Sequence, residues 1–223
     1  MSRIRLWLRW CWYAVSQVLV QLAAVLLYRV RYSGQLNIPA AGPLIIVSNH
    51  QSHFDPPLIG MGTRRQMNYV ARGTLFGFAP FRWLISSLGA IRIEREGIGL
   101  GGIKESLRRL KRGEVVVLFP EGTRTHDGRL GEFHGGFITL ARRSGAAILP
   151  AAIEGAFDAW PRHRMLPRLG EIHVRYGTPL TPETIATMSD EQVLAEVRRR
   201  IELCLRQLRA HPNLAHLQHR NAL

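Results

Sequence analysis

Short apolar runs alternate with helix-like segments along most of this 223-residue chain, and this alternation restricts the fold more than any other feature. Each apolar run is rich in aliphatic residues and is bounded by glycine, proline or polar residues, as strands are. The predicted strands are 44–47, 67–71, 90–93, 115–119, 147–152 and 172–176. The predicted helices are 57–62, 103–113, 137–143 and 189–208, the last with a Ser189–Gln192 capping box. This order predicts an α/β fold, a single domain with a mixed, mostly parallel sheet flanked by helices.

The composition is that of one globular domain with an anionic partner. Hydrophobic residues make up 46% and charged residues 21%, so neither disorder nor a protein with several membrane spans is indicated. The net charge is +14, and Lys104 and Lys111 are the only lysines, so the charge is almost entirely arginine. The excess of positive charge indicates an anionic partner, either nucleic acid or an anionic membrane surface. The chain has two cysteines, Cys11 and Cys204, which are too few for a disulfide framework, so a reducing compartment is expected. Neither cysteine has a histidine in metal-ligand spacing, so no structural metal is expected.

The N-terminal segment is predicted to associate with a membrane. Residues 10–28 are uncharged and lie between arginines, but Ser16, Gln17 and Gln21 belong to a polar stripe with three- or four-residue spacing. A helix that lies in the membrane interface explains the stripe better than a span, although the length is close to that of one span. The predicted organisation is an N-terminal membrane-associated helix over 1–32, the folded domain over 33–210 and a flexible tail over 211–223.

A histidine and an aspartate flank a predicted strand-to-helix turn. His50 follows the predicted strand 44–47, and Asp55 stands five residues later, directly before Pro56. Aspartate followed by proline is typical of a helix N-cap and first helical position. If the turn curls, the two side chains can meet as a general base and its orienting carboxylate. The alternative is a turn histidine beside an ordinary N-cap aspartate.

A second polar motif, Phe119–Thr125, follows directly on a uniformly apolar strand. Proline ends strand pairing and Gly122 permits a tight turn, so Glu121, Thr123 and Arg124 are delivered at one end of the sheet. An arginine with a hydroxyl group and backbone amides suits a phosphate monoester. The alternative is a turn with a solvated Glu–Arg pair.

Together with two further segments, these motifs resemble the four sequence blocks of the glycerolipid acyltransferases related to 1-acylglycerol-3-phosphate acyltransferase. The four segments are, in order, Asn49 to Asp55, Gly89 to Arg95, Phe119 to Arg124 and Ile148 to Ala151. The resemblance covers roughly Leu36 to Leu180, and its first and third blocks are specific in combination.

The resemblance implies a role for each motif. His50 would remove the proton from a glycerol hydroxyl, which attacks the thioester of an acyl-CoA or acyl-carrier protein, and Asp55 would orient it. The positions that the family associates with the phosphate and glycerol of the acceptor are matched by Arg95, Glu121, Gly122, Thr123 and Arg124. Pro150 lies in a block linked to the acyl side. No metal or organic cofactor is implied.

The absence of an evident nucleophile agrees with direct transfer. The chain has no Gly-x-Ser-x-Gly motif, and both cysteines lie far from the motifs in sequence. The sequence does not identify the donors to the oxyanion, for which backbone amides in the turn between Asn49 and Ser52 are candidates. His53 is assigned a structural role. His134 departs from the lysine of many family members, and Arg92 occupies a position that is often apolar or proline; both leave the choice of acceptor open.

Two other functions compete with this interpretation. Residues 97–102 satisfy Gly-x-Gly-x-x-Gly, and Glu121 and Arg124 stand where a ribose-binding acid and a 2′-phosphate ligand would be, as in an NADP-binding oxidoreductase. The fingerprint does not follow its strand directly, which weakens this hypothesis. A non-enzymatic basic module would bind nucleic acid or membrane, but the chain has no zinc finger or RNA-binding aromatic motif.

The predicted function is acyl transfer from acyl-CoA or acyl-carrier protein to a lysolipid, most simply 1-acylglycerol 3-phosphate, to give phosphatidate. A lyso-aminolipid or another lysophospholipid is the alternative acceptor. The expected location is the membrane, with the active site facing the cytoplasm, an anionic membrane surface as partner and no nucleic acid.

Overall fold

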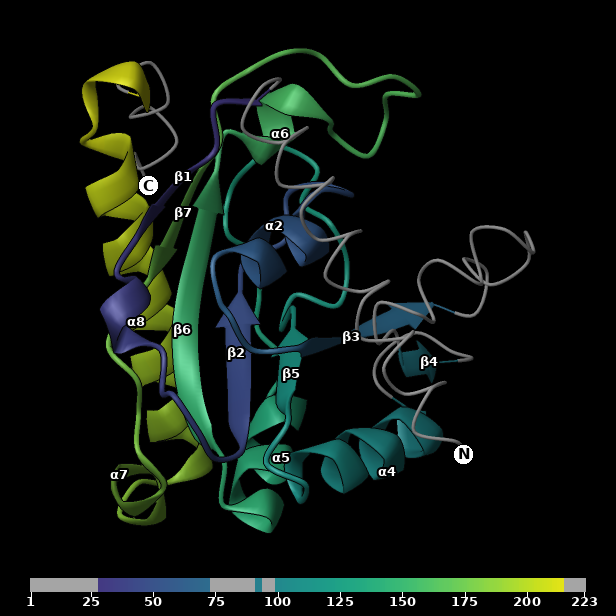
Figure 1. Ribbon diagram of the computed structural model, residues 1–223, viewed down its shortest axis with the longest axis vertical. Helices are drawn as coiled ribbons and strands as arrows, with labels where there is room; N and C mark the ends of the chain where they lie inside the picture. Colours follow the sequence, from purple (N-terminus) through teal and green to yellow (C-terminus); the bar gives the residue numbers. More distant parts are fainter. Residues whose placement is uncertain (1–27, 73–90, 94–98, 215–223) are drawn as a thin grey trace.

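The computed structural model describes residues 28–72, 91–93 and 99–214 (Figure 1). The strands are β1 (Arg31–Ser33), β2 (Leu44–Ser48), β3 (Met67–Arg72), β4 (Ile91–Ile93), β5 (Val115–Leu118), β6 (Ala147–Glu154) and β7 (His173–Tyr176). The α-helices are α2 (Asp55–Met61), α4 (Gly99–Leu110), α5 (Gly136–Ser144), α6 (Ala156–Ala159), α7 (Pro182–Ala186) and α8 (Asp190–Arg209), and a 3-10 helix, η1, spans Gln35–Asn37.

Within the described residues, the strands form one seven-stranded sheet in the order β1-β7-β6-β2-β5-β3-β4. The strands from β6 to β4 in this order are mutually parallel, whereas β7 is antiparallel to β6, and β1 is parallel to β7. The predicted mixed, mostly parallel sheet of an α/β fold is therefore confirmed. Because β2 lies between β5 and β6, the residues that follow it are flanked by the carboxyl ends of two parallel neighbours.

Helices cover both faces of the sheet, which explains why its central strands are apolar throughout. Successive residues of β2 point to opposite faces, since Ile45 and Val47 pack in the cluster that includes α5 and α8, whereas Leu44 and Ile46 pack with α2. In Figure 1, α2 lies in front of the sheet and α8 runs beside β6 and β7. All four residues of β5 are buried, as expected for a strand covered on both faces.

The sequence did not predict β1, η1, α6 or α7, each of which has five residues or fewer. None of them contains an apolar run like those that predicted the other short strands, and pairing or packing with distant residues decides them. β1 contains the predicted boundary between residues 32 and 33, and it pairs with β7. Because Tyr28 and Val30 are also buried in the core, the described residues before 33 pack as part of the domain.

Two helix starts test the local signals in the sequence. The Ser189–Gln192 capping box at the start of α8 is confirmed, with both of its reciprocal hydrogen bonds present. The prediction that Asp55 caps α2 is wrong by one position, because Phe54 is the N-cap and Asp55 is the first helical residue. The Asp55 carboxylate accepts hydrogen bonds from amides that precede the helix, so it does not serve as a cap.

Several predictions concern residues 1–27, 73–90, 94–98 and 215–223, which lie outside the described part of the chain. They include most of the predicted N-terminal helix, the end of the predicted flexible tail, and Arg95. Within the part of the chain that the structure describes, no helix is long and apolar enough to cross a membrane.

Candidate active site

The two polar motifs meet at the carboxyl edge of the sheet, as the sequence predicted. His50 follows β2 by two residues, and Glu121 follows the adjacent parallel strand β5 by three. The backbone N–H of His50 donates to Oε1 of Glu121 at 2.8 Å, and the N–H of Thr125 donates to the carbonyl of His50 at 2.8 Å. Two hydrogen bonds therefore join motifs that stand about 70 residues apart in the sequence.

His50 and Asp55 form the predicted pair. Nδ1 of His50 lies 2.8 Å from Oδ2 of Asp55, whose side chain is fully buried, whereas the His50 side chain is 18% exposed. The imidazole also stacks on Phe119, with ring centroids 4.0 Å apart and planes 19° apart. A hydrogen bond from Nδ1 to a carboxylate fixes the tautomer in which Nε2 carries the lone pair. The partly exposed ring can then accept a proton from a bound hydroxyl.

Backbone amides hold the Asp55 carboxylate in place. Its Oδ2 accepts from the N–H groups of Gln51 at 2.5 Å and Ser52 at 2.7 Å, in addition to the His50 ring. The turn between β2 and α2 thus curls around the carboxylate, which brings together two residues five apart in the sequence. The same contacts contradict the hypothesis that amides between Asn49 and Ser52 hold an oxyanion, because those of His50, Gln51 and Ser52 already donate to carboxylates.

Glu121 lies against the backbone of the turn between β2 and α2. Oε1 accepts from the N–H of His50, and Oε2 accepts from the N–H of Gly131 at 2.9 Å. Burial raises the pKa of Glu121 from its ordinary value of 4.5 to about 7, while the hydrogen bonds from Gly131 and His50 act in the opposite direction. Both carboxylate oxygens therefore have protein partners, so this geometry supports His50 in addition to any contact with an acceptor.

The remaining predicted site residues differ in their exposure to solvent. Gly122 and Thr123 are exposed and Arg124 is half-buried, all in the loop that follows β5. Gly122 has φ +67°, which is the backbone conformation for which glycine was predicted in this turn. Pro150 is buried within β6 and pairs with Val47, three residues before His50, so the structure does not bring its side chain to the pair. Arg95 lies outside the described residues.

A network of buried polar side chains attaches the turn between β2 and α2 to β6 and α8, and the sequence did not predict it. The side-chain amide of Asn49 donates to the carbonyl of Ile153 and accepts from its N–H, both at 2.9 Å. Nε2 of Gln51 donates to Glu154 at 3.1 Å, and Glu154 forms an ion pair with Arg209 of α8 at 2.6 Å. No local motif marks these pairs, because their partners are separated by more than 50 residues.

His53, the second histidine of the turn, packs against Trp160, with ring centroids 5.0 Å apart. Burial, together with the positive charges of Arg124 and His50, lowers its pKa from the ordinary value of 6.5. The packing of His53 against an aromatic ring agrees with the structural role assigned to it, but does not test that role.

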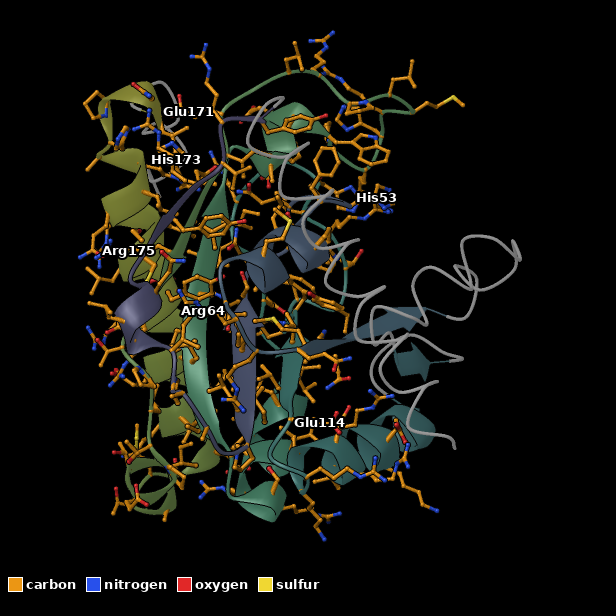
Figure 2. The ribbon with its side chains drawn as sticks, viewed as in Figure 1. His53, Arg64, Glu114, Glu171, His173 and Arg175 are labelled. Atoms are coloured by element: carbon orange, nitrogen blue, oxygen red, sulfur yellow. The ribbon has the colours of Figure 1, made fainter. Side chains whose placement is uncertain are left out.

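A cavity of about 260 Å³ lies away from this pair, between β1, β7 and α8. Figure 2 shows two of its lining residues, His173 and Arg175, beside α8. Among the described residues, no group of three or more histidine, cysteine, aspartate or glutamate side chains is arranged to hold a metal ion.

The glycine fingerprint is not arranged as an NADP site would require. Gly99, Gly101 and Gly102 belong to the first turn of α4, and the strand that precedes them, β4, is at the edge of the sheet. Glu121, the expected ribose ligand, is buried, and both of its oxygens accept from backbone amides. These contacts weigh against the oxidoreductase hypothesis.

The fold and the site define a class: an α/β protein with a hydrogen-bonded histidine–aspartate pair at the carboxyl edge of its sheet. The family model described as Acyltransferase matches residues 29–154, which is more than half of the chain and includes both motifs. The chain belongs to this acyltransferase family.

Three relatives are similar to the chain in sequence, and one solved structure is similar to it in fold. A chloroplastic 1-acyl-sn-glycerol-3-phosphate acyltransferase, LPAT1 of Arabidopsis thaliana, is 32% identical over 138 residues, which are 60% of this chain and 38% of the relative. A 1-acyl-sn-glycerol-3-phosphate acyltransferase of Pseudomonas aeruginosa is 32% identical over 86% of this chain and 72% of the relative. A lyso-ornithine lipid O-acyltransferase of the same organism is 31% identical over 64% of this chain and 54% of the relative.

The solved structure is the crystal structure of the 1-acyl-sn-glycerophosphate acyltransferase PlsC from Thermotoga maritima. It superimposes with a TM-score of 0.82 at 26% identity, over 95% of this chain and 85% of that chain. The fold is thus shared almost throughout. The chain nevertheless spans only about two fifths of the length of the chloroplast relatives that it matches.

Proposed function

We propose that this chain transfers a fatty acyl group to the free hydroxyl of a lysolipid, with His50 as general base and Asp55 as its orienting carboxylate. The observation that carries the proposal is the 2.8 Å contact between His50 Nδ1 and the buried Asp55 carboxylate. The pair lies at the same edge of the sheet as the motif Phe119–Thr125. Membership of the acyltransferase family supports the reaction type.

The proposed reaction is a direct transfer. Nε2 of His50 accepts the hydroxyl proton as the acceptor oxygen attacks the thioester carbonyl, and Asp55 stabilises the imidazolium that forms. The tetrahedral intermediate collapses with cleavage of the C–S bond, and the proton passes to the departing thiolate. A thiolate is a good leaving group, since a free thiol has a pKa of about 8.5, so one general base can serve the whole reaction. General-base assistance of this kind contributes about 10²- to 10⁴-fold.

The preferred acceptor is 1-acylglycerol 3-phosphate, which would give phosphatidate. The loop after β5 carries Thr123 and Arg124, and the N–H of Thr125 in the same loop donates to the carbonyl of His50. A hydroxyl and a guanidinium group at these positions suit a phosphate monoester. Arg95 is proposed as a further phosphate ligand because of the family resemblance. Two relatives named as 1-acyl-sn-glycerol-3-phosphate acyltransferases support this choice.

The second candidate acceptor is a lyso-aminolipid such as lyso-ornithine lipid. The observation that favours it is His134, which stands where many family members have lysine. A Cβ atom built on Gly122 would lie 3.6 Å from the His134 ring, so this departure is beside the loop assigned to the phosphate. A relative named as a lyso-ornithine lipid O-acyltransferase supports the same alternative.

The proposal includes the donor and the location. Acyl-CoA or acyl-carrier protein serves as acyl donor, and no metal or organic cofactor takes part. The chain acts at an anionic membrane with its active site facing the cytoplasm, anchored by the part of the predicted segment 1–32 that precedes Tyr28, and it does not act on nucleic acid. The net charge of +14 supports the anionic membrane as partner.

Acyl-transfer rates with different acceptors test this proposal. The purified full chain is supplied with labelled acyl-CoA or acyl-carrier protein, and kcat/KM is compared for lysophosphatidate and lyso-ornithine lipid. We expect lysophosphatidate to be preferred by at least about tenfold, since a hydrogen bond to a charged group is worth about 1.5–3 kcal/mol. A preference for lyso-ornithine lipid would select the second candidate. No transfer with either donor to any lysolipid would contradict the proposed function.

A further inference from the structure

The segment 161–170, which joins α6 to β7, holds a concentration of exposed apolar side chains. The exposed fractions are 91% for Met165, 78% for Leu166 and 75% for Leu169. These three are most of the exposed large hydrophobic residues in the described part of the chain, and they lie within five residues of one another. A cluster of this kind on a water-facing surface indicates a site that contacts a membrane or another molecule.

The charges in the same segment are all of one sign. Arg162, Arg164 and Arg168 alternate with the apolar residues, and there is no aspartate or glutamate from residue 159 to residue 170. Apolar side chains that insert below the headgroups, with arginines at the depth of the phosphates, form the pattern by which peripheral proteins bind anionic bilayers. The three exposed apolar residues together with three arginines between Asp158 and Glu171 favour this interpretation over that of an ordinary solvated loop.

Hydrogen bonds hold this segment in one shape. The indole N–H of Trp160 donates to the carbonyl of Arg164 at 3.0 Å, and the N–H of Arg168 donates to the carbonyl of Ala159 at 2.7 Å. The chain therefore closes back on the end of α6. The apolar side chains point to solvent from a closed loop, so they need no large rearrangement to enter a bilayer.

The loop is attached to the candidate active site. The hydroxyl of Ser52 donates to the carbonyl of Trp160 at 2.8 Å, and the Trp160 ring packs against Phe54 and His53 at 4.9 and 5.0 Å. Figure 2 shows His53 beneath the loop. Nη1 of Arg162 lies 2.7 Å from Nε2 of His126, which belongs to the loop after β5. The segment thus contacts both motif-bearing loops.

We propose that the loop 161–170 inserts Met165, Leu166 and Leu169 into an anionic lipid bilayer and so holds the His50 edge of the sheet at the level of the headgroups. A lysolipid in the bilayer presents its free hydroxyl at that depth. The inference deepens the proposed function and rests on it for the lipid nature of the acceptor. Insertion of the loop is nevertheless a physical event that can be measured without catalysis.

The first test measures the depth of the loop directly. The full chain with Cys11→Ser and Leu166→Cys is labelled with an environment-sensitive fluorophore, since Cys204 is buried in the folded protein. It is mixed with vesicles of equal parts phosphatidylglycerol and phosphatidylethanolamine. The control carries the label at Leu36→Cys, which is fully exposed in η1 and follows β1, a strand that runs opposite to β6.

We expect a blue shift and a several-fold increase in emission at position 166 and none at position 36. Pure phosphatidylcholine vesicles should give a weaker response, because the arginines would lack anionic partners. Equal responses at the two positions, or none at position 166, would overturn the proposal. Because residues 1–32 are themselves predicted to bind membranes, total vesicle binding is not the readout.

The second test separates insertion from catalysis. The triple variant M165S/L166S/L169S is compared with Leu36→Ser on a lysolipid embedded in vesicles and on a short-chain lysolipid that is monomeric in solution. Loss of the inserted side chains should lower kcat/KM on vesicles by about tenfold or more and leave the monomeric substrate unchanged. Arg168→Gln should lower the vesicle rate by roughly fivefold, and added salt should reduce this difference.

Two results would overturn the inference while leaving the proposed function intact. Equal losses of activity on embedded and monomeric lysolipid would show that the loop acts in catalysis or folding. A loss confined to assays with acyl-carrier protein as donor would show that the arginines bind an acidic protein. If the wild-type chain transferred no acyl group at all, the proposed function would fail, and the fluorescence test would still report on insertion.

Discussion

Glu121→Gln is the perturbation that separates support of the general base from binding of the acceptor. Each carboxylate oxygen of Glu121 accepts one backbone N–H, from His50 and from Gly131. A glutamine retains one acceptor oxygen but presents an NH₂ group to the second N–H. One of the two amides is then left without an acceptor in a buried position, which costs about 1–3 kcal/mol.

The pKa of Glu121 gives this prediction a definite pH dependence. The pKa is raised from 4.5 to about 7 in the folded protein, so the folded state binds the proton more tightly than the unfolded state does. The stability that comes from this proton is fully present below pH 4.5 and is lost as the pH rises through about 7. A pKa difference of this size corresponds to about 3 kcal/mol of unfolding free energy. Glutamine does not titrate, so the unfolding free energy of the variant does not fall for this reason as the pH rises.

Thermal unfolding at about pH 5 and about pH 8 measures the effect. We expect the apparent melting temperature of the wild type to fall, relative to that of the variant, by roughly 6–12 °C between the two conditions. Groups common to both proteins cancel in this comparison. A difference between wild type and variant that is the same at both pH values would refute the raised pKa.

The kinetics of the same variant test the role of the side chain. If Glu121 positions His50, kcat falls by about tenfold and the KM for the lysolipid is unchanged, because the base is displaced and the acceptor contacts remain. A raised KM with unchanged kcat would instead support the acceptor-binding role that the family resemblance implies for Glu121.

Three further changes follow from the contacts of the turn. Asp55→Asn should lower kcat by about 10³- to 10⁴-fold in the acyl-transfer assay, because an amide no longer fixes the His50 tautomer; a loss below tenfold would count against the pair. Arg209→Met should lower the unfolding free energy by about 3–5 kcal/mol, since it leaves Glu154 buried without its cation, whereas the exposed control Arg206→Met should unfold like the wild type. Gly122→Ala should cost about 1–2 kcal/mol in the same unfolding measurement, because φ is +67°, and an unchanged stability would show that the turn can relax.

The sequence predicted those parts of the fold that depend on local pattern. The α/β class and the sheet type followed from apolar runs and from the spacing of helix residues, and the capping box placed the start of α8 correctly. The short elements β1 and α7 contain no apolar run, unlike the equally short strands β2 and β5 that were predicted. Distant residues hold them, as β7 does for β1.

The meeting of the two motifs was predictable because parallel strands bring their carboxyl ends to one edge of a sheet. The partners of each polar atom were not predictable. The Asp55 carboxylate, expected as a cap on the helix that follows it, accepts from the amides of Gln51 and Ser52, which precede that helix. The same amides were candidate donors to an oxyanion. Because the turn curls around the Asp55 carboxylate, they donate to that carboxylate instead.

Contacts between residues far apart in the sequence could not be predicted either. Nothing in the local pattern relates Gln51 to Glu154, or Glu154 to Arg209, because each is an ordinary polar residue in its own segment. The exposed apolar residues of the loop 161–170 gave no signal either, since a short apolar pair in a loop is common. Their exposure is a property of the folded chain alone.

Acyl transfer by His50→Ala tests the central claim most directly. Transfer of a labelled acyl group from acyl-CoA, or from acyl-carrier protein, to lysophosphatidate is measured in membranes that contain matched amounts of wild type, His50→Ala and His53→Ala. With His50 as the base, the wild type and His53→Ala transfer the label, whereas His50→Ala is slower by about 10²- to 10⁴-fold. Equal transfer by His50→Ala and the wild type would contradict the account.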